Sequence, residues 1–170
     1  MSIARSFERI RIAYSNGERR PLAGYLSAMS TYAGLIGTAV LVGRRTGARL
    51  PDRVSAGDVL LLSVATHKAS RLLTKSSITA ALRAPFTRFE EPAGVAEVNE
   101  SVRGEGVRHA VGELVTCPFC SGVWIATALT AGHVLAPRAT RIGMTTLVAV
   151  AASDWLHLGY EAAKQHLAKG

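Results

Sequence analysis

The only two cysteines of the chain, Cys117 and Cys120, stand where a polar segment gives way to an apolar one. Two intervening residues let both sulfurs converge on one point, the geometry of a thiol couple or of half a metal site. Pro118 suits the first turn of a helix, and a helix N-terminus stabilises a thiolate. This turn is therefore the first candidate for chemistry in the chain.

A metal site at this turn needs about four ligands. Glu113 and His109 fall on the same helical face as Cys117 and Cys120 if the helix extends back, so these four residues form a candidate metal site that would suit zinc. Two alternatives stay open. One is a redox couple, although the chain has no second cysteine pair to relay electrons, and the other is plain packing of two small residues at a helix start. A reducing cytoplasmic location favours metal or free thiols over a disulfide.

A second group of polar residues interrupts two apolar segments. His67, Lys68 and Arg71 end one segment, and Asp154 and His157 lie near the end of another, so together they form a candidate intramembrane polar cluster. Asp154 is the only acid in the interior of an apolar segment, and an acid at membrane depth usually pairs with a cation. We therefore predict an ion pair between Asp154 and Lys68 or Arg71. The alternatives are a carboxylate that faces headgroup water and cations that extend to the interface.

Four apolar segments must position these groups: residues 22–43, 58–74, 119–136 and 142–160. The first carries no charge and is long enough, at about 1.5 Å per residue, to cross a hydrocarbon core of about 30 Å. The second is weaker, and the short loop 137–141 makes the last two an antiparallel hairpin. We predict an all-α fold, an integral membrane bundle of about four transmembrane helices.

The chain divides into two predicted parts. In residues 1–20, Ile3, Phe7, Ile10 and Tyr14 share one helical face, which predicts an amphipathic helix. That helix either lies at the cytoplasmic membrane surface or packs on the rest of the protein. Residues 21–170 form the predicted membrane bundle, with a long polar loop at 75–115.

The net charge of +8 and the pI near 10.2 do not indicate nucleic-acid binding, because the basic residues are spread over termini and loops without interleaved aromatics. Attraction of juxtamembrane cations to anionic lipid explains the same charge. Arg83 and Arg88, with Lys68 and Arg71, are candidate lipid-headgroup ligands.

Four spans would place twelve Lys and Arg with both termini and the 75–115 loop, and six on the other side. The positive-inside rule then places both termini in the cytoplasm.

Three motifs resemble a known family. They are Arg71-Leu72-Leu73-Thr74-Lys75, then Leu82-Arg83-Ala84-Pro85-Phe86, and then Gly112-Glu113-Leu114 followed by Cys117-Pro118-Phe119-Cys120-Ser121-Gly122-Val123-Trp124. This combination resembles the uncharacterised bacterial membrane family called domain of unknown function thirteen-sixty, which includes a sporulation-associated protein. The resemblance covers roughly residues 58–160. It implies a small multi-pass protein of the bacterial cytoplasmic membrane and no particular activity.

Two function classes follow from these observations. The first is a non-enzymatic partner-binding or scaffold component, with a structural cysteine site at its cytoplasmic face. The second is a membrane thiol-redox or metal-dependent enzyme that acts at the cytoplasmic leaflet. The chain shows no nucleophile–base or phosphate-loop motif, so we favour the first. The expected partners are membrane lipids and either another protein or a second copy of the chain.

Overall fold

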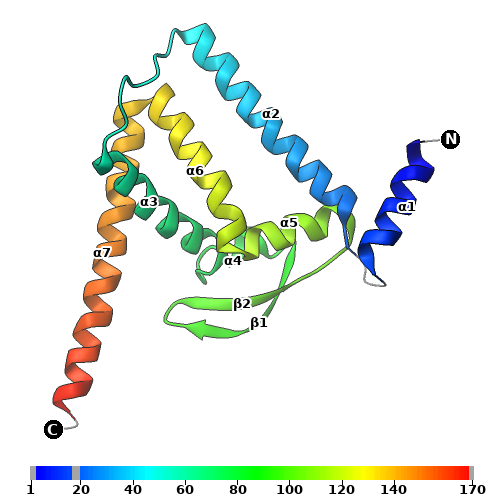
Figure 1. Ribbon diagram of the computed structural model, residues 1–170. Helices are drawn as coiled ribbons and strands as arrows, with labels where there is room; N and C mark the ends of the chain where they lie inside the picture. Colours follow the sequence, from blue (N-terminus) through cyan, green and yellow to red (C-terminus); the bar gives the residue numbers. More distant parts are fainter. Residues whose placement is uncertain (1–2, 17–19, 169–170) are drawn as a thin grey trace.

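The computed structural model describes residues 3–16 and 20–168, and these are mostly helical (Figure 1). Five longer helices dominate: α1 (Ile3–Ser15), α2 (Leu22–Thr46), α3 (Ala56–Thr74), α6 (Pro118–Leu135) and α7 (Pro137–Leu167). Residues 1–2 and 17–19, which belong to the predicted 1–20 helix, lie outside the described residues. On the predicted apolar face of α1, Ile10 and Tyr14 are exposed.

The ends of α2 and α3 follow from local chemistry. The backbone of Gly47 adopts φ of 67°, a left-handed conformation that suits glycine, and its N–H caps the last turn of α2. At the start of α3, the Ser55 side chain accepts a hydrogen bond from the Asp58 N–H while the Asp58 carboxylate accepts one from the Ser55 N–H. This reciprocal cap starts the helix two residues before the apolar segment that we predicted at 58–74.

The four helices α2, α3, α6 and α7 alternate in direction along the chain. In Figure 1, α2 and α6 run up from the end at which α5 (Gly106–Thr116) lies, whereas α3 and α7 run back down toward it. Helix α3 packs against α6 and α7, and α2 packs against α5 and α6. The C-terminal part of α7 extends well past the other helices.

The prediction of an all-α fold with a 75–115 loop is wrong in one respect. Residues 75–116, here called the polar cap, fold into α4 (Ala80–Arg83), an antiparallel hairpin of β1 (Thr87–Gly94) and β2 (Glu97–Val102), and α5. The hairpin places Thr87 opposite Val102 and Phe89 opposite Glu100. Val98 and Val102 lie four residues apart, so they share one face of a strand. This is a weak strand signal, and the many charges and Pro92 around it do not favour a sheet.

The interior of the described chain is small. Its buried apolar residues are Ala65, Val98, Ala110, Met144 and Ala151. The exposed surface is 12166 Å², whereas a compact soluble protein of 18 kDa exposes about 8,000 Å². Two helices, α2 and α6, are long and apolar enough to cross a membrane. Their apolar side chains therefore face outward rather than into a core, and this weakly suggests membrane association.

Candidate functional site

The cysteine turn is a corner between α5 and α6. Proline disfavours helical backbone in the residue before it, and Cys117, which precedes Pro118, is accordingly extended, with φ of −102° and ψ of 110°. Helix α5 thus ends at Thr116, and α6 begins at Pro118. The Cys117 sulfur accepts a hydrogen bond from the Cys120 N–H at 3.3 Å, so it fills the N-cap place that Ser or Asp usually takes.

Both thiols are free, with Cys117 half-buried and Cys120 exposed. Burial acts to raise the pKa of the Cys117 thiol. Hydrogen bonds from the Cys120 side chain and from the N–H groups of Cys120 and Phe119 outweigh it, and the positive charge of Lys75 adds to them. The pKa of Cys117 therefore lies below its ordinary value. The two sulfurs thus have different environments, and the environment of Cys117 favours the thiolate.

The other two predicted metal ligands make different contacts. The Glu113 carboxylate accepts a hydrogen bond from the Tyr25 hydroxyl at 2.6 Å and lies 3.9 Å from the Arg20 guanidinium. His109 Nε2 is 3.5 Å from the same carboxylate, and its Nδ1 lies 3.1 Å from the Gly104 carbonyl oxygen. Glu113 therefore connects α5 to the start of α2.

Within residues 3–16 and 20–168, no three His, Cys, Asp or Glu side chains gather where they could hold a metal ion. The donor set predicted from spacing is thus not assembled. Helical spacing placed the four residues on one face only if a single helix ran from 109 to 120, and the break at Cys117 divides that helix in two.

The predicted polar cluster divides into separate contacts. Lys68 donates to the Asp154 carboxylate, which confirms the predicted ion pair and selects Lys68 over Arg71. Arg71 instead binds Glu97 of β2 through Nε at 3.1 Å and Nη2 at 2.6 Å. His67 and His157 are both exposed. Lys68 thus joins α3 to α7, and Arg71 joins α3 to the polar cap.

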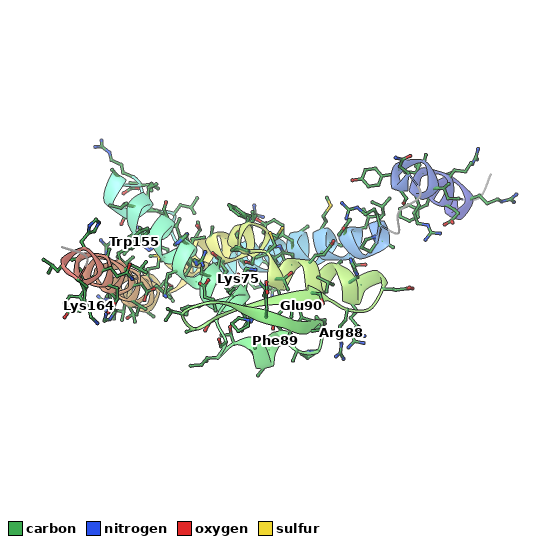
Figure 2. All side chains as sticks on the ribbon, turned by 90° about the horizontal axis from the view of Figure 1, so that it is seen from below. Lys75, Arg88, Phe89, Glu90, Trp155 and Lys164 are labelled. Carbon is green, nitrogen blue, oxygen red and sulfur yellow. The ribbon has the colours of Figure 1, made fainter. Side chains whose placement is uncertain are left out.

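The prediction that Arg83 binds lipid headgroups is wrong, because its side chain is fully buried within the polar cap. Its Nε donates to Glu100 at 2.5 Å, its Nη1 to the Leu73 carbonyl at 2.7 Å and its Nη2 to the Ser76 carbonyl at 3.1 Å. A buried charge is tolerated only when its donors are satisfied in this way. Arg88, in contrast, is exposed on β1 (Figure 2).

Sequence reasoning missed the contacts that hold α2 to the rest. The rings of Tyr32 and Trp124 pack edge to face with centroids 5.1 Å apart, and the Tyr32 hydroxyl lies 2.6 Å from Thr127 Oγ1. Gly24 approaches α5 so closely that a methyl group there would lie 2.6 Å from the Gly106 carbonyl oxygen. The only sequence signal was small and aromatic residues within an apolar run, which does not name a partner helix.

Comparison with known proteins assigns the chain to a family. The family model described as protein of unknown function (DUF1360) matches residues 61–160, from within α3 to within α7. The sporulation protein YjcA of Bacillus subtilis (strain 168) is 32% identical over 109 residues, which cover 58% of this chain and 92% of that protein. No solved structure matches the chain. Because the family model covers more than half of the chain, the protein belongs to the DUF1360 family.

Proposed function

We propose that the protein is a multi-pass membrane scaffold: α2, α3, α6 and α7 cross the bacterial cytoplasmic membrane and hold the polar cap at one face for a protein partner. The observation that carries this proposal is a folded cap that exposes large apolar side chains. The buried Arg83–Glu100 pair fixes the cap, and Ile78 and Val95 are 90% and 96% exposed on it. Contiguous exposed apolar surface commonly marks an interaction site, and we infer that these side chains belong to such a surface.

Four membrane crossings are supported by the large apolar surface and by the alternating helix directions (Figure 1). Helices α3 and α7 carry charges, but Lys68 and Asp154 neutralise each other, which lowers the cost of placing either near lipid. At about 1.5 Å per residue, the 31 residues of α7 span about 46 Å, so this helix is longer than the hydrocarbon core requires.

The cytoplasm is the proposed compartment of the cap and of both termini. The twelve-to-six distribution of Lys and Arg supports this orientation. The exposed apolar face of α1 suits a membrane surface, and Arg5 is exposed on the same helix, where it can meet anionic headgroups. Lipid and one protein partner, or a second copy of the chain, are then the ligands of this molecule.

Reporter insertions test the arrangement in the membrane. A reporter after Gly47 and another in the hairpin turn after Val95 should report opposite sides, with the Val95 insertion cytoplasmic. A reporter fused at the C-terminus should agree with the Val95 insertion. Signals on the same side from Gly47 and Val95 would eliminate the four-crossing arrangement.

Photo-cross-linking tests the scaffold surface. A photoreactive residue at Leu82, which is exposed on the cap next to the buried Arg83, should give one discrete protein adduct in membranes. Phe89→Ser, on exposed β1, should abolish that adduct, whereas Asn99→Ala on β2 should leave it unchanged. Loss of the adduct in both variants, or in neither, would contradict a specific apolar contact surface.

A further inference from the structure

The cysteine turn has a geometry that a purely structural corner does not require. Pro118 already ends α5 and starts α6, and a serine would cap α6 as well as a cysteine does. Instead, this corner carries two free thiols, and the Cys117 sulfur accepts the Cys120 N–H at 3.3 Å in the first turn of α6. Phe119, between them, is 88% exposed.

We propose that Cys117 and Cys120 form a dithiol that carries out thiol–disulfide exchange with a disulfide presented at this face of the protein. Cys117 is the attacking sulfur, because its Sγ accepts the Cys120 N–H at the helix N-terminus, where partial positive charge favours a thiolate. Cys120 is the resolving sulfur, since it lies one turn into α6 and is exposed. This activity goes beyond the scaffold function and does not depend on it.

The exchange balances in two steps. The Cys117 thiolate attacks one sulfur of the disulfide R–S–S–R′, so that a Cys117–S–S–R bond forms and R′–S⁻ leaves. Cys120 then gives up its proton to solvent and attacks the Cys117 sulfur, which forms the Cys117–Cys120 disulfide and releases R–S⁻. The protein loses two electrons and the bound disulfide gains them. Reverse exchange with a cellular thiol restores the dithiol.

Local side chains support this order of events. Lys75, at the end of α3, contributes positive charge at Cys117 and so favours its thiolate. In the view of Figure 2, Lys75 is labelled near the middle of the molecule. Phe119 offers an apolar contact beside the sulfurs for the chain that carries the disulfide. The half-buried position of Cys117 restricts its attack to disulfides that reach the corner.

Single serine variants of the full chain in detergent test the proposal, because serine at either position retains a cap-forming or solvent-facing side chain and leaves the fold intact. Oxidised glutathione is the probe. Cys120→Ser should retain one glutathione on Cys117, detected by intact mass. In the wild-type protein, both thiols should become unreactive toward an alkylating reagent, and no glutathione should stay attached to the chain. Cys117→Ser should react at least about threefold more slowly than Cys120→Ser, because it keeps no sulfur that accepts the amide N–H at the start of α6.

A second experiment uses insulin, whose disulfides join protein chains, to distinguish a protein disulfide from a small-molecule disulfide as the substrate. Reduction of insulin by reduced wild type, with formation of the Cys117–Cys120 disulfide, identifies a protein disulfide as substrate, and reaction with glutathione alone identifies a small one. Equal rates for the two serine variants, or a wild-type protein that retains glutathione with its second thiol still alkylatable, would overturn the proposal. Either result would leave the cysteines as packing residues at the corner.

Discussion

Lys68 of α3 and Asp154 of α7 form an ion pair across 86 residues of chain. A second pair, Asp58 with Arg141 at 3.1 Å, joins the starts of the same two helices. The two contacts lie ten positions apart on α3 and thirteen on α7, so the helices run in the same direction. Parallel neighbours of this kind require the intervening α6 to return the chain, as it does in Figure 1.

The stability of Asp154 variants should show whether the Lys68–Asp154 pair is shielded from water. In the chain alone the Lys68 side chain is 15% exposed and the Asp154 side chain 51%. An exposed pair contributes about 0–1 kcal/mol, whereas removing one partner of a pair shielded from water costs about 3–5 kcal/mol. If lipid shields the pair, Asp154→Asn should lower the melting temperature in lipid nanodiscs clearly, and Asp154→Asn with Lys68→Met should recover part of the loss. A wild-type melting temperature for the single variant would mean a solvated pair.

The Arg83–Glu100 pair should control the folding of the polar cap. Both side chains are buried, at 1% and 5% exposure, so Arg83→Ala should destabilise the cap by about 3–5 kcal/mol. Hydrogen exchange of β1 and β2 should then rise sharply while exchange in α6 changes little. Arg88→Ala, an exposed arginine of the same cap, is the matched control and should stay within about 0.5 kcal/mol. Equal protection of the hairpin in both variants would show that Arg83 does not hold it.

Gly24 should be required for the contact between α2 and α5. A methyl group there would lie 2.6 Å from the Gly106 carbonyl and 2.8 Å from Ala110 Cβ, so Gly24→Ala should cost about 1–3 kcal/mol. Gly34→Ala is the control on the same helix. Nothing lies within 4 Å of its new methyl, so alanine should stabilise α2 slightly. Thermal unfolding in detergent compares the two, and a Gly24→Ala protein as stable as Gly34→Ala would contradict the close approach.

Alkylation of Cys117 should follow its lowered pKa. Because the pKa in the folded chain lies below the ordinary value, the thiolate persists at pH values where an unfolded thiol is protonated. Its contribution to stability is therefore present above the unfolded pKa and is lost as the pH falls through the folded pKa. Iodoacetamide labelling with peptide mass mapping should show a lower pH midpoint for Cys117 in folded protein than in urea. Coincident midpoints would exclude this electrostatic environment.

Local chemistry in the sequence was enough to predict several parts of the molecule. Long apolar runs predicted α2 and α6, because helix length and hydropathy depend on composition alone. Pro118 marked the start of α6 through the geometry of its own ring. Asp154, the only acid in the interior of an apolar segment, required a nearby cation, and Lys68 provides one. Three motifs between Arg71 and Trp124 were enough to predict the family.

Only the tertiary structure determines the contacts that no periodicity in the sequence predicts. Arg71 follows Lys68 by three positions, which turns it about 60° away round the helix and toward Glu97 rather than Asp154. Glu113 accepts a hydrogen bond from Tyr25 of α2, a residue 88 positions away, and no spacing in the sequence predicts this partner. Arg83 is buried because a polar segment folds back over it, and neither its charge nor its neighbours in sequence predict that burial. Such contacts join residues distant in the chain, so their energies appear only when the helices and the hairpin have packed.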